Sequence, residues 1–217
     1  MEDLKVLLKE HGDEDTRQQM EAYMKNKFSF LGIKTPLRRE LTKDFLREKR
    51  REKALDWNFI FWTWQQDERE FQYLGLDYFK AMDKYLKFED LDKIRYLATK
   101  RSWWDSVDGL HRSLGRLSLR DERLKDLMLD WSQDENMWIR RLAIDHQLHL
   151  KEATDKELLG NIIKNNLGSD EFFINKAIGW ALRDYSKTDQ AWVKDFLEEN
   201  KKGLSNLSLR EASKYLS

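Results

Sequence analysis

The sequence contains no cysteine, one proline and nine glycines among its 217 residues. Without cysteine the chain can form neither a disulfide framework nor a thiolate metal site, a composition that fits a reducing cytosol. The scarcity of proline and glycine leaves few strand-turn-strand patterns and no linker that would divide the chain. No apolar run approaches the length of a membrane span, and the start, MEDLKVLLKEHGDED, lacks the pattern of a signal peptide. We therefore expect a cytoplasmic protein that does not associate with membranes.

An excess of charge of one sign is also missing, since 40 Lys and Arg residues face 40 Asp and Glu residues. The whole-chain balance thus indicates no polyanionic partner, and the distribution along the chain matters more. Residues 34–53 hold nine basic and four acidic side chains, a pattern typical either of a solvated helix face or of a polyanion contact. Aromatic residues are abundant, with nine tryptophans, so the chain can bury a core despite its 37% of charged residues.

Apolar residues recur at helical spacing through nearly the whole sequence, which predicts an all-α protein of about a dozen short helices. Thr35 and Pro36 offer an N-cap and a first-turn proline for a helix that ends near Arg50, and Asp56 can cap the segment WNFIFWTW. Further helices are predicted over residues 3–11, 15–26, 68–83, 89–99, 103–110, 119–131, 136–149, 154–166, 170–186, 189–199 and 207–216.

A faint internal repeat relates three segments, FQYLGLDY (71–78), IRRLAIDH (139–146) and INKAIGWA (174–181). They are offset by 68 and 35 residues, close to multiples of the period of helical-hairpin repeats. Such repeats stack so that each pair of helices completes the core of its neighbour. We predict a single domain over residues 1–217, an α-solenoid whose concave face is the binding surface.

The segment SWWDSVD (102–108) combines two tryptophans with two aspartates. Ser102 followed three residues later by Asp105 predicts a capping box and hence a helix start. On that helix Trp104 and Asp108 share one face, whereas the other side is apolar, with Trp103, Val107 and Leu110. Two interpretations follow: either Trp104 and Asp108 form part of a site, or the indole packs inward and the carboxylate is solvated.

Two other helices also mix aromatic rings with charges. In FFINKAIGWALRDY the side chains of Lys176, Trp180 and Arg183 form one row, and in NMWIRRLAIDHQLH Arg141 shares a face with a tryptophan and with Asp145. This mixture suits nucleic acid, because cations neutralise phosphates while rings contact sugars or bases. Alternatively, the rings are the cores of neighbouring repeats and the aliphatic stems of arginine cover them.

Most other chemistry is excluded by the motifs. His146 and His149 are three residues apart, but no HExxH motif or carboxylate-flanked ligand set accompanies them, so we expect no metal site. Glycine-rich phosphate loops and a nucleophilic serine elbow are absent. Any catalysis must therefore use carboxylate, aromatic ring, guanidinium and water.

Five stretches together resemble a known family: AYMKNKFSFLGIKTPLRR (22–39), SWWDSVD (102–108), MWIRRLAI (137–144), EFFINKAIGWALRDYSKT (171–188) and LSLREASKYL (207–216). In this order they resemble the AlkD family of DNA alkylation repair glycosylases, which are built from HEAT-like helical repeats. The resemblance runs from about Tyr23 to Leu216, and the residues before it match only as a helical pattern. It implies hydrolysis of the N-glycosidic bond of cationic N3- or N7-alkylated purines in duplex DNA, as in base excision repair, without a metal or organic cofactor.

The resemblance also assigns roles to residues. It places the family's catalytic carboxylate on Asp108, its two aromatic walls on Trp104 and Trp180, and its arginine at the DNA backbone on Arg141. Contacts to the duplex fall on Tyr23, Thr35, Arg39 and Arg183, and Lys176, in the same row as Arg183, is a further candidate. An anionic carboxylate can stabilise positive charge on the sugar and orient the attacking water. The family is understood to act on the sugar without inserting the base into a protein pocket.

We accordingly expect a bacterial protein that acts as a monomer on double-stranded DNA containing alkylated purines, in the cytoplasm at the nucleoid. Two alternatives stay open. The first is a HEAT-like repeat protein that binds branched or distorted DNA without catalysis, which base release from methylated duplex would exclude. The second is a protein-interaction scaffold, for which DNA binding would be absent even at low salt, where phosphate contacts are strongest.

Overall fold

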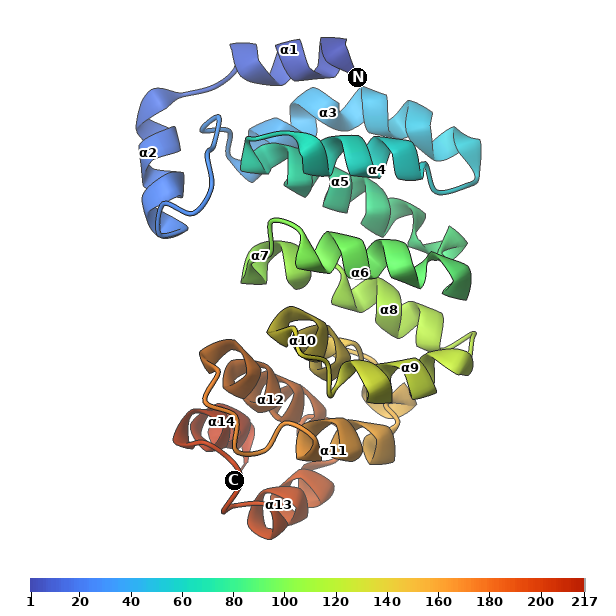
Figure 1. Cartoon of the computed structure of the whole chain (residues 1–217), viewed down its shortest axis with the longest axis vertical. Helices are drawn as coiled ribbons and strands as arrows, with labels where there is room; N and C mark the ends of the chain where they lie inside the picture. Colours follow the sequence, from blue (N-terminus) through green and yellow to red (C-terminus); the bar gives the residue numbers. More distant parts are fainter. Residues whose placement is uncertain (217) are drawn as a thin grey trace. The chain divides into compact units, whose positions relative to one another are not determined.

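The computed structural model describes residues 1–216, which form helices joined by turns and loops, with one isolated bridge between Ser29 and Glu68. The chain forms two compact units, Met1–Leu86 and Lys87–Ser217 (Figure 1). The predicted all-α class is confirmed, whereas the predicted single domain with a concave face stays a prediction. Within residues 1–216, the helices are all too short or too polar to cross a lipid bilayer.

The first unit contains five α-helices and two short 3-10 turns: α1 (Glu2–Glu10), α2 (Glu14–Tyr23), α3 (Thr35–Lys49), Arg50–Glu52, α4 (Trp57–Gln65), α5 (Arg69–Met82) and Asp83–Tyr85. Asp56 caps α4 as predicted, because its carboxylate accepts the backbone N–H of Phe59 at 2.9 Å. The α3 helix begins at Thr35 itself, so Thr35 is not its cap. Helix α5 packs against α3 and α4 and buries Phe71, Leu74 and Tyr78.

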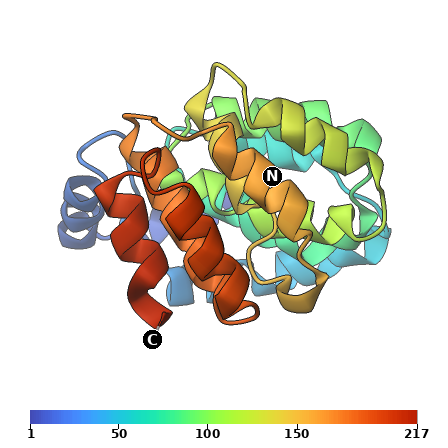
Figure 2. The ribbon, with the colours of Figure 1, turned by 90° about the horizontal axis from the view of Figure 1, so that it is seen from below.

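The second unit contains the remaining helices: α6 (Leu91–Thr99), α7 (Trp104–Val107), α8 (His111–Ser118), α9 (Arg123–Trp131), α10 (Met137–Asp145), α11 (Lys156–Lys164), α12 (Phe172–Tyr185), α13 (Gln190–Glu199) and α14 (Asn206–Ala212), with 3-10 turns at Phe88–Asp90, Lys151–Ala153 and Ser213–Tyr215. Helix α10 contacts α6, α7, α8, α9, α11 and α12, so it forms the centre of the unit. Helix α12 packs against α10, α13 and α14. Helices α12, α13 and α14 belong to the orange to red segment of Figure 2.

Two glycines in this unit let helices approach closely. A β-carbon at Gly115 of α8 would lie 2.3 Å from the carbonyl oxygen of His146, just after α10. A β-carbon at Gly179 of α12 would lie 2.6 Å from the β-carbon of Glu211 on α14. Both distances are below van der Waals contact, so any larger residue must push the helices apart. Because α12 and α14 carry site residues described below, Gly179 fixes part of the site geometry.

We expect Gly179→Ala to lower the free energy of unfolding by about 1–3 kcal/mol, because the added methyl group overpacks the α12–α14 contact. Urea denaturation gives the measurement. Gly160→Ala on α11 is the matched control, since its β-carbon would lie 3.4 Å from the rings of Trp192 and Phe196, an ordinary contact. If the Gly179 variant were as stable as the Gly160 variant, the close approach of α12 and α14 would not limit this position.

The segment around SWWDSVD differs from the sequence prediction. The hydroxyl of Ser102 donates to the carbonyl of Ala98 at 2.7 Å, and Trp103 is the N-cap residue of α7, without a side-chain cap. The predicted capping box is therefore wrong. The helix ends at Val107, and a separate helix, α8, follows from His111, which the sequence pattern did not predict. The buried residues of α8 include Leu114 and Leu117, which continue the helical spacing of Leu110.

Helix α10 is shorter than predicted, since it ends at Asp145 and not near residue 149. The Nδ1 atom of His146 donates to the carbonyl of Ala143 at 2.6 Å, and His149 adopts a left-handed conformation with φ of 70°. The backbone N–H of His149 donates to the carboxylate of Asp184 on α12. These local bonds turn the chain away from the helix axis directly after Asp145.

Candidate active site

Asp108 lies at the C-terminal end of α7, where its backbone N–H donates to the carbonyl of Trp104 at 2.8 Å. Its carboxylate receives two hydrogen bonds from Arg141 on α10, from Nε to Oδ1 at 2.8 Å and from Nη2 to Oδ2 at 2.9 Å. Such a bidentate pair fixes both the position and the orientation of a carboxylate. The Asp108 side chain keeps 17% of its surface exposed, so solvent or a ligand can still reach it.

The predicted role of Arg141 at the DNA backbone stays a prediction, and the structure gives the contacts of its side chain. Its side chain is only 3% exposed, and its Nη1 donates to the backbone carbonyl of Phe173 on α12 at 2.7 Å. The guanidinium thus joins the end of α7 to α12 through α10, and its charge is directed at Asp108 and not at the surface. In this arrangement Arg141 holds the candidate catalytic carboxylate. The sequence shows the helical face of Arg141 but not which carboxylate stands opposite it.

A second carboxylate, Asp145, lies one helical turn beyond Arg141 and is 1% exposed. Its Oδ2 is 3.5 Å from Nε of Arg141, and neither of its oxygens accepts a hydrogen bond from residues 1–216. Burial raises the pKa of Asp145 to about 7, and burial also raises the pKa of Asp108, which the hydrogen bonds from Arg141 oppose. Because Asp108 has two charge-assisted bonds and Asp145 has none, Asp145 is the carboxyl of the pair that takes up a proton first as the pH falls.

The two tryptophans that precede Asp108 differ in what they contact, as the helical spacing predicts. Trp103 belongs to an aromatic cluster, with its ring 5.9 Å from that of Trp138 and 5.0 Å from that of Phe173. Trp104 is half-buried, as Trp103 is, and its backbone carbonyl accepts the N–H of Asp108. The first tryptophan therefore packs α7 against α10 and α12, and the second stays beside the carboxylate turn.

Trp180 on α12 reaches the same region through His111. The two rings meet edge to face at 6.3 Å between centroids, and His111 lies three residues after Asp108 at the start of α8. Trp180 also lies seven residues, or about two helical turns, beyond Phe173, whose carbonyl binds Arg141. The ring of Trp180 is half-buried. Two predicted aromatic walls and the predicted carboxylate thus come from connected segments of one unit.

Lys176 and Arg183 have a common partner that the sequence reasoning did not single out. The carboxylate of Glu211 on α14 lies 2.9 Å from Nζ of Lys176, 2.7 Å from Nη1 of Arg183 and 2.9 Å from Nζ of Lys214. Glu211 is 5% exposed, and hydrogen bonds from Lys214 and Lys176 lower its pKa to about 2. Three cations around one carboxylate leave a local positive excess beside Trp180, as an anionic ligand requires. Glu211 is part of the family-like stretch LSLREASKYL, but only the structure gives its partners.

The predicted contacts Tyr23, Thr35 and Arg39 belong to the first unit. Tyr23 is 72% exposed, and it lines a hollow of about 300 Å³ with Thr35, next to Lys34. The structure therefore brings two of the three predicted residues together. The guanidinium of Arg39 pairs with Asp77 at 3.1 Å and is mostly exposed, while Arg38, its buried neighbour, holds the other oxygen of Asp77.

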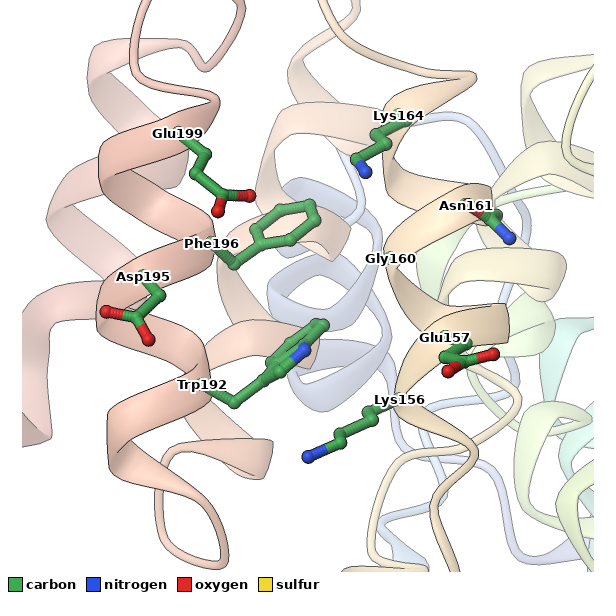
Figure 3. Close-up of a pocket in the computed structure, with 9 residues that line it drawn as sticks. All are labelled: Lys156, Glu157, Gly160, Asn161, Lys164, Trp192, Asp195, Phe196 and Glu199. Carbon is green, nitrogen blue, oxygen red and sulfur yellow. The ribbon is translucent and has the colours of Figure 1, made fainter.

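A further hollow of about 400 Å³ lies between α11 and α13 (Figure 3). The ring of Trp192 stacks near that of Phe196 at 5.1 Å, and Gly160 leaves room for both rings. The charged side chains at its rim are exposed, and none of the predicted site residues lines it. Within residues 1–216, no three His, Asp or Glu side chains are grouped so that they could hold a metal ion.

Comparison with known proteins decides the family. The family model described as DNA alkylation repair enzyme matches residues 4–216 of the chain. The chain belongs to the DNA alkylation repair enzyme family. This confirms the resemblance drawn from the five sequence stretches, and it covers both units of the structure.

One solved structure agrees with membership of the DNA alkylation repair enzyme family. A protein described as a predicted DNA alkylation repair enzyme from Enterococcus faecalis superposes with a TM-score of 0.86 at 35% identity, over 95% of this chain and 97% of that chain. An alkylpurine DNA glycosylase, AlkC of Pseudomonas fluorescens, bound to DNA containing an abasic site analog, gives a TM-score of 0.43 at 24% identity, over 66% of this chain and 47% of that chain. This second likeness is too slight to carry an argument. Comparison with curated proteins gave no match.

Proposed function

We propose that this member of the family is a DNA glycosylase that hydrolyses the N-glycosidic bond of cationic N3- and N7-alkylated purines in duplex DNA. The observation that carries the proposal is the carboxylate of Asp108, which is held by two bonds from buried Arg141 and is still 17% exposed. A fixed, accessible anion beside half-buried indoles suits a reaction in which positive charge develops on a sugar. The family membership over residues 4–216 supports the same chemistry.

The proposed reaction needs no strong general acid. An alkylated purine is already positive, so the bond from C1′ to the purine nitrogen breaks with its electron pair moving to that nitrogen. The purine leaves neutral, and positive charge develops on the deoxyribose. Asp108 stabilises this charge and orients a water molecule, which attacks C1′ and gives its proton to the carboxylate. Because Arg141 uses one lone pair of each Asp108 oxygen, each oxygen retains a second lone pair for the water or the sugar.

The tryptophans and the cations have separate roles in this proposal. Trp104 and Trp180 contact the deoxyribose with their rings, each contributing about 0.5–2 kcal/mol through cation–π attraction. Lys176 and Arg183 bind the DNA backbone, because their two positive charges exceed the single negative charge of Glu211. The first unit contributes further backbone contacts from Tyr23, Thr35 and Arg39. Because the chemistry occurs at the sugar, it needs no pocket that encloses the base. Arg141 acts through Asp108 and not on a phosphate.

The direct test incubates the protein with methylated duplex DNA and measures free N7-methylguanine by mass spectrometry. We expect release well above spontaneous depurination. A second candidate function, binding of branched or distorted DNA without excision, is favoured by one observation, namely that the charge of Asp108 is already paired with Arg141. Tight binding of a four-way junction together with no release of base from the methylated duplex would establish that second function.

We expect Trp180→Ala to lower the rate of base release by about tenfold, which corresponds to the loss of about 1.4 kcal/mol of cation–π attraction in the transition state. Trp180→Phe should lose less, because a smaller ring remains over the sugar. The matched control is Trp192→Ala on α13, which removes an indole from the hollow of Figure 3. Its release rate should equal that of the wild type under conditions where both are folded. Equal losses in the Trp180 and Trp192 variants would argue against a ring at the sugar.

A further inference from the structure

Asp145 has no part in the reaction just proposed, yet its position is costly. Its side chain is 1% exposed, and neither carboxylate oxygen accepts a hydrogen bond from residues 1–216. Burying a carboxylate without hydrogen bonds destabilises a protein, so a leucine or a methionine would serve the core of α10 better. The burial of an acid at this position therefore calls for a functional explanation.

The geometry of Arg141 supplies a functional explanation for the buried carboxylate of Asp145. Its Nε carries a single hydrogen, which is donated to Oδ1 of Asp108 at 2.8 Å, while Oδ2 of Asp145 lies 3.5 Å from the same nitrogen. One guanidinium thus stands between two carboxylates and bonds to only one of them. When both carboxylates are ionised, the group of three has a net charge of one negative unit. When one is protonated, it is neutral.

Few other charged groups act on this trio, and Asp105 on α7 is one of them, since its charge raises the pKa of Asp108. Arg141 and Asp108 are the charged side chains whose fields act on Asp145. Helix α12 reaches Arg141 with an uncharged acceptor, the carbonyl of Phe173, and α8 begins with the buried imidazole of His111. His146, the residue after Asp145, is kept neutral because burial lowers its pKa to about 4. Competition for Arg141 therefore takes place between the two aspartates.

We propose that Asp145 is a positioning residue that sets how strongly Arg141 neutralises the charge of Asp108. As a neutral acid, Asp145 leaves the guanidinium to Asp108. As an anion, Asp145 shares the guanidinium, so less of the Asp108 charge is neutralised. The inference rests on the proposed function, since it concerns the charge that a developing sugar cation experiences. The ionised state of Asp145 is the more active state, because a less neutralised Asp108 stabilises that cation more strongly.

The direction of the pH effect follows from the raised pKa of Asp145, which burial brings to about 7. Below that pH the residue is protonated and the site is neutral, and above it the site is negative. The rate of base release at saturating enzyme should therefore rise as the pH passes through about 7. Asp145→Asn has nearly the same shape but cannot ionise, so it fixes the low-pH state.

The kinetic experiment compares single-turnover release of N7-methylguanine between pH 5.5 and 8.5 in the wild type and in Asp145→Asn. We expect a rise of about tenfold in the wild type and a flat profile in the variant, so that their rates agree at pH 5.5 and differ at pH 8.5. Asp195→Asn, which removes an exposed carboxylate on α13, is the control and should retain the wild-type profile. A rise of the same size in Asp145→Asn would overturn the proposal.

A second measurement does not depend on catalysis. In protein labelled with ¹³C at the aspartate carboxyl groups, NMR should show one carboxyl that titrates near pH 7, with the Asp108 resonance shifting at the same pH. In Asp108→Asn that titration should move to lower pH, because Asp145 then has Arg141 to itself. If every aspartate in the folded protein titrated below pH 5, the inference would be wrong even if base release occurred. If the coupled titration were present but no base were released, the proposed function would fail instead.

Discussion

Asp108→Asn is expected to reduce the release of N7-methylguanine by at least about 100-fold, because it removes the anion that faces the developing sugar cation. A unit negative charge about 4 Å from a unit positive charge is worth roughly 4 kcal/mol at an effective dielectric constant of about 20. That is about a thousandfold in rate, more than either indole can supply. The carboxylate, and not the rings, should therefore dominate catalysis.

The same substitution should leave the fold intact, and the reason lies in Asp145. Once Asp108 is neutral, Arg141 remains compensated because Asp145 can ionise beside it at 3.5 Å. The asparagine oxygen can still accept one bond from the guanidinium, and the bond to Phe173 is unchanged. We expect the free energy of unfolding at pH 7 to change by about 1 kcal/mol or less, in the range of a single hydrogen bond. DNA binding should also persist, since Lys176 and Arg183 are untouched.

Single-turnover release, urea denaturation and binding to methylated duplex together measure this prediction. The result that would contradict it is base release by the Asp108 variant at the wild-type rate. Loss of release together with loss of folding would show that Asp108 is chiefly a structural partner of Arg141. The combination of an intact fold, intact DNA binding and no release is the signature of a catalytic carboxylate.

Arg141→Leu should have the largest effect on stability, lowering the free energy of unfolding by about 3–5 kcal/mol, because it leaves two carboxylates in the interior without their cation. Asp108 and Asp145 would then face each other at the centre of the second unit, where α7, α10 and α12 meet. Base release should be lost as well, since nothing would orient Asp108. Urea denaturation at several pH values tests this directly.

The pH dependence of that loss has a definite sign. Without Arg141 the folded-state pKa values of both carboxyls rise further above their unfolded values of about 4. A carboxyl with a raised pKa favours the folded state at low pH, and this advantage is lost as the pH rises through the folded-state value. The destabilisation of the Leu variant should therefore be small at pH 4 and largest at pH 8. A loss that did not depend on pH would contradict the buried-charge explanation.

Arg141→Lys is the matched control for this prediction. Lysine retains the positive charge but offers a compact ammonium group in place of the planar fork that binds both oxygens of Asp108. We expect it to recover much of the stability at pH 8 but little of the activity, because Asp108 is compensated without being oriented. Similar activity in the Lys variant and the wild type would mean that charge alone, and not geometry, is required of Arg141.

Helical periodicity predicted much of the architecture and some of the site. It assigned Trp103 to packing and Trp104 to the side of Asp108, and it placed Lys176 and Arg183 in one row, which the structure confirms by their common partner Glu211. Spacing succeeds in these cases because residues three, four or seven apart share a helix face whatever the helix packs against. The all-α class follows from the same signal.

What periodicity could not give is any contact between helices. The family resemblance implied a place for Arg141 at the DNA backbone, but the sequence did not show the carboxylate 33 residues earlier that it meets. Helix α8 was also missed, although Leu114 and Leu117 are buried at helical spacing. The sequence placed Asp145 on the face of Arg141, but only the structure shows that its carboxylate is buried without a hydrogen bond from residues 1–216. Interhelical pairing and burial of charge are properties of the tertiary fold.

The bond from Arg141 to Phe173 has a consequence for how this protein can diverge. Its acceptor is a main-chain carbonyl, so the side chain at position 173 can change over generations without breaking the bond. Comparing homologous sequences would therefore not reveal this link, since no second residue type must vary in step with the arginine. Inserting or deleting one residue within α12 after Phe173, in contrast, would rotate the rest of the helix by about 100° relative to that carbonyl. The register of α12, more than the side chain at position 173, should be what selection preserves.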